Sequence, residues 1–354
     1  MPRVVRLPAT LDERDFRLLN DWQRDFPLQR RPFEHIGREL DMAESEVIER
    51  YRHFLASGLI SRVGAVFAPR RLGASALAAL AAPPDRLEEV AARINREISI
   101  NHNYEREHHF NLWFVLTAPG EAELDAVVAG IERDTGCKVI VLPLLEEFHI
   151  DLGFDLGSGL GRQQSRYVRH DERGPAPAAR VTAPNEGGVL DAGGRALIRA
   201  LQAGLALEAA PYAELGRRAG CGESEVLARI EGWVADGLIR RFGAVVRHHE
   251  LGIEANAMCV WDVSDEDASA LGMKLAAEPA VTLCYRRRRA LPDWPYNLFC
   301  MIHGSARDDV LSAHAELSRR HGLERFPGAV LFSCRRFKQT GARYLSAETR
   351  PERV

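Results

Sequence analysis

The chain has 354 residues, which is enough for about two domains of ordinary size. Apolar residues make up 46% and charged residues 27%, a mixture typical of globular proteins and not of collagen-like or wholly disordered chains. Lys and Arg number 47 against 50 Asp and Glu, and the resulting net charge of -3 does not favour a dedicated nucleic-acid-binding protein.

The sequence gives no signal for a membrane span or a secretory leader. No run approaches the roughly 18 apolar residues that a span needs, and the first residues lack the apolar core of a signal peptide. The six cysteines are scattered without a CxxC pair, so they do not indicate a zinc ribbon, an iron–sulfur motif or a disulfide framework. We therefore expect a cytoplasmic protein with no membrane partner and no metal site of its own.

The first 73 residues have the pattern of three helices followed by a strand. Apolar residues at helical spacing predict helices around 18–22, around 36–40 and over 44–56, and Gly58 is placed to end the third. The alternating segment 59–67 predicts a short strand. Three helices and a strand in this order are typical of a winged helix-turn-helix domain.

The segment that follows alternates strands and helices in the order β-α-β-β-α-β. Its periodicity predicts two helices, at 85–97 and 121–133, and four strands, at 75–82, 99–106, 111–118 and 138–145. This order is that of a ferredoxin-like domain, so the fold class predicted for each module is α+β.

The whole arrangement is present twice. Residues 32–73 recur at 211–252 without a gap, 179 residues further on, with identical pairs that include Pro32/Pro211, Gly58/Gly237, Arg62/Arg241 and Gly64/Gly243. A second ferredoxin-like pattern follows, with strands at 256–263, 280–287, 296–303 and 328–336 and helices at 265–277 and 305–320. We therefore expect a tandem duplication whose two modules pack about a pseudo-twofold axis, as in a fused dimer.

The repeat also sets the expected domain boundaries. The stretch between the modules is rich in Gly, Pro, Arg and Ser and has no hydrophobic periodicity, which predicts a linker. The predicted segments are a helix-turn-helix domain at 1–73, a ferredoxin-like domain at 74–155, the linker at 156–188, a second helix-turn-helix domain at 189–252, a second ferredoxin-like domain at 253–345 and a tail at 346–354.

A helix-turn-helix unit followed by a ferredoxin-like domain resembles the Lrp/AsnC regulators. A DNA-binding regulator that responds to a ligand is therefore one candidate function. However, the candidate recognition helix 44–56 carries Glu44, Glu46 and Glu49 against Arg50 and Arg52. Phosphates would repel such a helix, so we do not expect DNA to be a partner.

The most unusual residues lie in the second strand of each ferredoxin-like domain. Three histidines fall within eight positions of the first domain, at His102, His108 and His109, whereas the second domain has four consecutive arginines at 286–289. Because side chains alternate along a strand, we expect His102, Tyr104, Arg106 and His108 to share one face. The same rule puts Tyr285, Arg287 and Arg289 on one face of the second domain and the other two arginines on the opposite face.

These segments carry a specific resemblance. HNYEREH with NLWF, YRRRR with DWPYNLF, and the closing FKQTGARY are similar to the siroheme decarboxylases of heme d1 and alternative heme biosynthesis. The similarity covers nearly the whole chain except the linker and tail, with both subunit types fused. It implies loss of CO2 from the C12 and C18 acetates of siroheme, giving 12,18-didecarboxysiroheme, with no cofactor beyond the iron tetrapyrrole substrate. A non-catalytic tetrapyrrole carrier is the alternative, and neighbouring heme d1 enzymes and a second copy of the chain are candidate partners.

Decarboxylation of an acetate leaves a carbanion that must be protonated. A histidine that titrates near neutral pH is suited to this step, and a tyrosine is a second candidate, so we expect His102, Tyr104 and His108 to be catalytic. His102 or His108 is also a candidate axial contact for the siroheme iron. The structural alternatives are that His102 is a hydrogen-bonded core residue and that His108 and His109 only shape the hairpin.

The many carboxylates of siroheme favour arginine as the binding residue. The run of arginines is alternatively a charged edge strand, and Arg62 and Arg241, next to glycines at the domain junction, are alternatively ion-pair partners. His149 and Lys338 each follow a phenylalanine that is a candidate core anchor. The predicted substrate-binding residues are Arg62, Arg106, His109, Asn111, Trp113, His149, Arg241, Tyr285, Arg287, Arg289 and Lys338.

Overall fold

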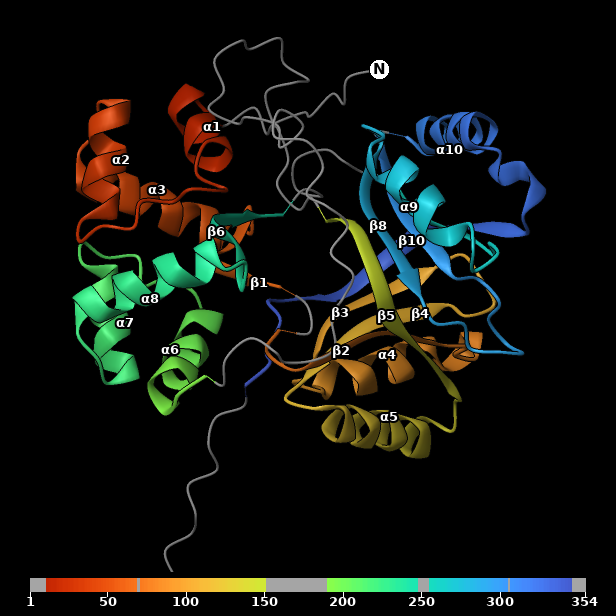
Figure 1. Ribbon diagram of the computed structural model, residues 1–354. Helices are drawn as coiled ribbons and strands as arrows, with labels where there is room; N and C mark the ends of the chain where they lie inside the picture. Colours follow the sequence, from red (N-terminus) through yellow and green to blue (C-terminus); the bar gives the residue numbers. More distant parts are fainter. Residues whose placement is uncertain (1–10, 69–70, 151–189, 248–254, 305, 346–354) are drawn as a thin grey trace, which may run out of the picture.

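A computed structural model describes residues 11–68, 71–150, 190–247, 255–304 and 306–345 (Figure 1). Two helical units lie on one side, a large sheet with its own helices lies on the other, and β1 and β6 lie between them. Within these residues no helix is both long enough and apolar enough to cross a membrane. The predicted linker 156–188 and the tail 346–354 lie outside the described residues.

Each helical unit has three helices and a strand, as predicted. Pro32 and Pro211 occupy the first turn of the second helix, where proline costs no hydrogen bond. Gly58 and Gly237, with φ of 80° and 76°, follow the third helix in the left-handed conformation that ends it. The elements are α1 (Glu13–Asn20), α2 (Pro32–Leu40), α3 (Glu44–Ala56) and β1 (Ile60–Phe67), then α6 (Ala192–Gln202), α7 (Pro211–Ala219), α8 (Glu223–Ala235) and β6 (Ile239–Val246).

The two helical units join through an antiparallel pair of strands, β1 and β6, here called the ribbon. Gly64 pairs with Gly243, its own repeat equivalent, and Arg62 and Arg241 lie two residues to either side of this pair. A residue that pairs with its own equivalent lies on the symmetry axis, so the predicted pseudo-twofold axis passes through this glycine pair. The apolar side chains of both units then form one continuous core.

Each ferredoxin-like domain has the predicted order of elements, with a short 3-10 turn (Pro84–Arg86) at the start of the first predicted helix. In the first domain they are β2 (Ala74–Leu80), α4 (Leu87–Arg96), β3 (Ile100–Arg106), β4 (Leu112–Ala118), α5 (Glu121–Thr135) and β5 (Val139–Ile150). In the second they are β7 (Ala255–Trp261), α9 (Ala268–Ala276), β8 (Val281–Arg287), β9 (Leu298–Gly304), α10 (Arg307–His321), a 3-10 turn (Leu323–Arg325) and β10 (Gly328–Gln339). The α+β fold class and the duplication are confirmed.

The two domains form one closed sheet in the order β10-β3-β4-β2-β5-β8-β9-β7, with β7 pairing back onto β10. The joints are β5 with β8 and β10 with β3, so the last strand of each half pairs with the second strand of the other half. β5 and β10 extend to Ile150 and Gln339, beyond their predicted ends at 145 and 336. The extra residues pair across the halves, a contact between distant segments that local periodicity does not contain.

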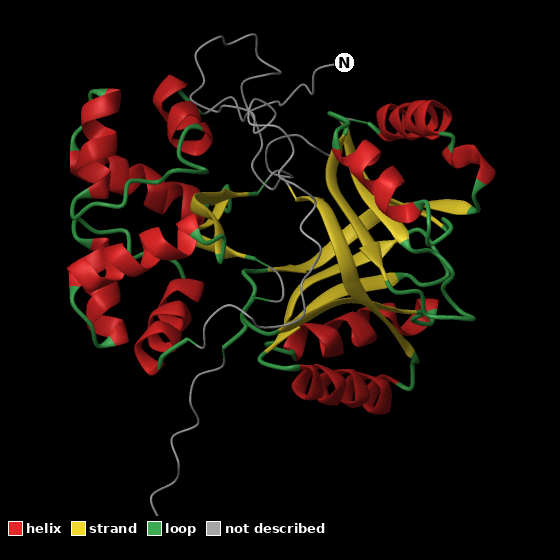
Figure 2. Cartoon of the chain, in the orientation of Figure 1, coloured by secondary structure: helices red, strands yellow, loops and turns green. Residues whose placement is uncertain are grey.

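The helices cover the outside of the closed sheet, with α4 and α5 on one half and α9 and α10 on the other (Figure 2). Inside the sheet a separate apolar cluster includes Trp113, Trp294, Phe299 and Leu142. The rings of Trp113 and Trp294 meet edge to face with centroids 4.9 Å apart. These side chains fill one part of the interior, and the part nearest the ribbon is left to the polar side chains described below.

The close approach of the ribbon to the first helical unit gives a stability prediction. A Cβ added at Gly243 would lie 2.3 Å from the carbonyl oxygen of Trp22, so Gly243→Ala should lower the free energy of unfolding by roughly 1–3 kcal/mol. Gly232→Ala is the matched control, because nothing lies within 4 Å of its added Cβ and helix propensity should raise stability by roughly 0.5–1 kcal/mol. Urea denaturation measures both, and equal stability of Gly243→Ala and the wild type would contradict the packing described.

Candidate functional site

A cavity of about 380 Å³ lies between the ribbon and the closed sheet. This volume is within the range of small-molecule sites. Equivalent residues of both halves line it, among them the pairs Arg62/Arg241, Ser75/Asn256, Tyr104/Tyr285 and Arg106/Arg287. The predicted catalytic residues His102, Tyr104 and His108 all belong to the first half, whereas here both halves line a single cavity.

A tyrosine with an arginine above it recurs on each side of the cavity. The Arg106 guanidinium lies 5.9 Å from the ring centroid of Tyr104, and that of Arg287 lies 5.0 Å from Tyr285. Arg106 donates a hydrogen bond to the carbonyl of Leu331 and Arg287 one to that of Leu142, each at 3.0 Å. Both carbonyls belong to the other half of the chain, so the cross-half strand pairing holds the two guanidiniums in place.

The charge in this cavity is unbalanced. Burial lowers the pKa of Arg62, Arg106 and Arg287 to about 10, which leaves all three cationic at neutral pH. Among the described residues none of the three forms an ion pair with a carboxylate, and the Nε atoms of Arg62 and Arg287 have no hydrogen-bond partner. Burying unpaired cations is costly, so the arrangement is that of a site for an anionic ligand.

The second half adds cations that have no equivalent in the first. Arg240 and Arg247 line the cavity at the positions that Ser61 and Ala68 occupy in the first repeat. Arg240 donates a hydrogen bond of 2.7 Å to Glu147. Neither arginine is among the predicted site residues, although comparing the two repeats, in which each arginine corresponds to a small residue, would have indicated them.

His102 lies in the cavity wall with Tyr104 and Arg106, as the strand alternation predicted. Its Nδ1 is 2.8 Å from Oδ1 of Asn101, and its ring stacks on Tyr104 with centroids 6.2 Å apart. Burial, together with the nearby Arg62, lowers the pKa of His102 to about 4, so the imidazole is neutral without a ligand. Burial also raises the pKa of Tyr104.

A second cavity histidine, His303, was missed by the sequence analysis. It lies on β9 at the position of Thr117 in the first half, and its Nδ1 is 2.9 Å from Oγ1 of Thr282. A single histidine near the end of an apolar strand belongs to no motif. The signal for it is the alignment of the two halves, in which this histidine corresponds to a threonine.

His108 and His109 lie outside the cavity, in the hairpin after β3. The strand ends at Arg106, so the alternation does not reach His108, whose Nδ1 accepts a hydrogen bond of 3.0 Å from the Phe110 amide. Its ring packs edge to face on Trp294, and the exposed His109 packs on Phe110. The geometry is that of the alternative in which both histidines shape the hairpin.

Three other predicted ligand contacts have structural partners instead. Asn111 exchanges hydrogen bonds of 2.8 and 2.9 Å with the backbone of Ala82, which ties β4 to the end of β2. The Lys338 ammonium donates to the carbonyls of Asn95 and Glu97 at the C-terminal end of α4. His149 lies on β5 opposite Cys284, outside the cavity lining, whereas Trp113 is part of that lining.

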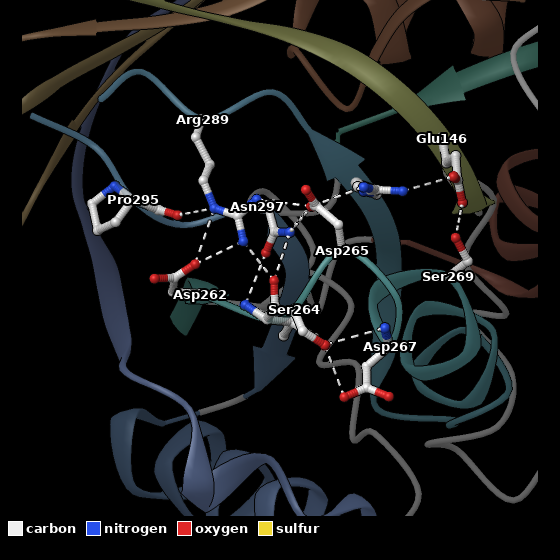
Figure 3. Close-up of polar contacts among 11 residues, drawn as sticks. Glu146, Asp262, Ser264, Asp265, Asp267, Ser269, Arg289, Pro295 and Asn297 are labelled. Atoms are coloured by element: carbon white, nitrogen blue, oxygen red, sulfur yellow. Dashed lines mark hydrogen bonds and ion pairs between the residues drawn. The ribbon is translucent and has the colours of Figure 1, made fainter. Parts of the chain in front are cut away.

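Arg289 also points away from the cavity. The prediction that it shares one strand face with Arg287 is therefore wrong. β8 ends at Arg287, and the Arg289 guanidinium binds Asp262 and Asp265 at 2.8 Å in a polar network outside the cavity (Figure 3). Arg286 is absent from the cavity lining, as the alternation predicted, and binds Asp265 and Glu146. It therefore shares Asp265 with Arg289, although the alternation put these two arginines on opposite faces. This network joins β8 to β5 and to the loop before α9.

Two models of known protein families match this chain. A model of the siroheme decarboxylase NirDL-like HTH domain matches residues 15–60 and 194–240. A model of the AsnC-like ligand binding domain matches 71–149 and 250–338. The four matches follow the helical units and the ferredoxin-like domains in order.

The relatives are similar over nearly the full length. The siroheme decarboxylase NirDL subunit of Paracoccus pantotrophus is 41% identical over 94% of this chain and 98% of its own, and the siroheme decarboxylase of Hydrogenobacter thermophilus is 30% identical over 94% and 95%. A crystal structure of the siroheme decarboxylase NirDL matches with a TM-score of 0.66 at 27% identity, covering 94% and 95% of the two chains. A second, in co-complex with an iron-uroporphyrin III analogue, matches at 0.64 and 26%, covering 94% of both. On this evidence the chain belongs to the siroheme decarboxylase family.

Proposed function

We propose that this chain is a carboxy-lyase that removes CO2 from the C12 and C18 acetates of siroheme, giving 12,18-didecarboxysiroheme. The observation that carries the proposal is a set of arginines around one cavity that have no carboxylate partner within the part of the chain that the structure describes, namely Arg62, Arg106 and Arg287. A polyanionic macrocycle supplies the missing negative charge. The names of the full-length relatives support the same ligand class, as does the iron-uroporphyrin III analogue in one of the matched crystal structures.

In this proposal the macrocycle lies between the ribbon and the closed sheet. Arg62 and Arg241 bind its carboxylates from the ribbon, and Arg106 and Arg287 bind them from the sheet. Guanidinium groups suit this role because they stay charged and match the geometry of a carboxylate. Trp113 and Tyr285 supply apolar and aromatic surface to the wall.

The reaction itself needs a positioned proton. When the bond to the carboxylate breaks, CO2 leaves and the electron pair stays on the methylene carbon, where the conjugated macrocycle spreads the charge. The carbon then takes a proton and the acetate becomes a methyl group. We assign this proton delivery to His102 and His303, with Tyr104 as a further candidate. The ligand's carboxylates raise the pKa of His102 as they bind, so His102 becomes protonated only in the complex.

The helix-turn-helix units serve the cavity in this proposal and do not bind DNA. Arg50 of α3 is held by Asp12, Asp15 and Glu46, and Arg52 donates to the carbonyl of Leu207. These contacts take up the basic groups that a recognition helix would offer to phosphates. The cytoplasmic location, the lack of an added cofactor, a homodimer and contacts with neighbouring heme d1 enzymes stay predictions.

The activity has a direct test. Incubation of the purified chain with siroheme under anaerobic conditions in D2O should give a product that has lost two CO2 and gained one deuterium in each new methyl group, read by mass spectrometry and NMR. Siroheme that stays bound and unchanged would instead indicate a carrier and would overturn the proposal.

The arginine run offers a matched pair for the binding role. Arg287→Met removes a cavity cation and should weaken siroheme binding by roughly 10- to 100-fold, because a hydrogen bond to a charged group contributes about 1.5–3 kcal/mol. Arg288→Met removes the same side chain from an exposed position outside the cavity lining and should leave the affinity unchanged. Titration by absorbance measures both, and equal affinities would argue against the assignment of Arg287.

The neutral state of His102 is testable without substrate. The folded pKa of about 4 lies below the unfolded value of about 6.5, so the unfolded chain binds the extra proton and stability falls as the pH drops through this window. Between pH 7 and pH 5 this histidine should account for a loss of roughly 2 kcal/mol. His102→Leu, which copies Leu283, should remove that part of the pH dependence in urea denaturation. An unchanged dependence would mean that His102 is not buried in its neutral form.

A further inference from the structure

The same β-bulge occurs in both halves at the edge of the cavity. In β3, Ile100 pairs with Leu116 and His102 with Val115, which leaves Asn101 as the extra residue. In β8, Val281 pairs with Ile302 and Leu283 with Met301, which leaves Thr282 as the extra residue. Asn101 and Thr282 are therefore the same position of the repeat. A bulge changes the direction in which side chains point. Here both the extra residue and the residue after it line the cavity in each half.

Each bulge residue holds an imidazole. Oδ1 of Asn101 lies 2.8 Å from Nδ1 of His102, and Oγ1 of Thr282 lies 2.9 Å from Nδ1 of His303. The two histidines are not repeat equivalents, since they lie on β3 and β9. Both nevertheless bind to the same duplicated position in their own half.

The partner of each Nδ1 indicates which nitrogen of the imidazole ring exchanges a proton. An amide oxygen only accepts, so Nδ1 of His102 carries the hydrogen that it shares with Asn101. The Thr282 hydroxyl lies 3.2 Å from the carbonyl oxygen of Met301 and 2.9 Å from Nδ1 of His303. When its one hydrogen goes to Met301, the hydroxyl accepts from Nδ1 of His303, and the proton that moves in either ring is then the one on Nε2.

The symmetry of the proposed substrate gives the two imidazoles separate tasks. The C12 and C18 acetates lie on adjacent pyrrole rings, in positions that a twofold axis through the bridge between those rings exchanges. The cavity is lined by residue pairs related by the protein's own pseudo-twofold axis, such as Tyr104 with Tyr285. When the two axes coincide, each half of the chain faces one of the two acetates.

We infer that Asn101 and Thr282 are positioning residues that each orient one imidazole toward one acetate of the same bound macrocycle. Asn101 acts through His102 on one acetate, and Thr282 acts through His303 on the other. At each site the bond between the methylene carbon and the carboxylate carbon breaks, CO2 leaves, and the methylene carbon keeps the electron pair and takes a proton from Nε2, so no oxidant or reductant is consumed. This inference rests on the proposed function.

The test is the identity of the partly decarboxylated product. Asn101→Leu and Thr282→Val remove the hydrogen bond with little change in volume. Each should slow one of the two decarboxylations by roughly 10- to 100-fold at nearly unchanged KM, because the aligned proton donor is lost and the arginines that bind the macrocycle remain. NMR of quenched reactions should find one mono-decarboxylated isomer with Asn101→Leu and the other isomer with Thr282→Val.

Two further variants separate positioning from folding. Thr282→Ser keeps the hydroxyl and should restore the second decarboxylation. Asn103→Ala removes a buried asparagine of β3 that bonds to Asn95 instead of to the cavity, and it should lower stability without accumulation of either isomer. Accumulation of the same isomer in both hydrogen-bond variants, or equal slowing of both steps, would overturn the inference. Failure of the wild type to decarboxylate siroheme would overturn the proposed function instead.

Discussion

The pairing of strands between the two halves is the interaction on which the site depends. β5 pairs with β8 and β10 pairs with β3, and these two joints turn two open ferredoxin-like sheets into one closed sheet. The same joints place the carbonyls of Leu142 and Leu331 against the guanidiniums of the opposite half. A separate module would lose these contacts along with half of the cavity wall. The duplication therefore provides more than two copies of a site, because the site exists only where the copies meet.

In the function proposed, the cavity combines binding residues that recur in both halves with proton donors that do not. The arginine and tyrosine pairs recur in both halves and give the cavity its positive charge. The two histidines do not recur, since the repeat equivalent of His102 is Leu283 and that of His303 is Thr117. A buried cation needs only a counter-charge from the ligand, so either half of the chain can supply the cation. Proton delivery needs one imidazole ring placed at one methylene carbon. It therefore depends on small differences between the two nearly equivalent halves of the cavity wall.

Much of this arrangement was predictable because its signals are local or periodic. The repeat gave the duplication, the order of elements gave the fold, and strand alternation put His102, Tyr104 and Arg106 on one face. Alternation failed where strands stop, so His108 and Arg289 were assigned to a surface that they do not reach. The bulges at Asn101 and Thr282 depend on the register between neighbouring strands. The carbonyls that bind Lys338 and the joints between halves depend on contacts between segments distant in sequence. No spacing pattern in a single chain contains that information.

All the proposed residue roles require that one tetrapyrrole occupies the shared cavity between the ribbon and the closed sheet. A crystal structure of the complex with siroheme would show whether it does. We expect a single macrocycle in the cavity, with its carboxylates on Arg62, Arg106, Arg241 and Arg287 and the C12 and C18 acetates beside His102 and His303. A macrocycle bound at any other surface, or one confined to a single half of the sheet, would contradict it.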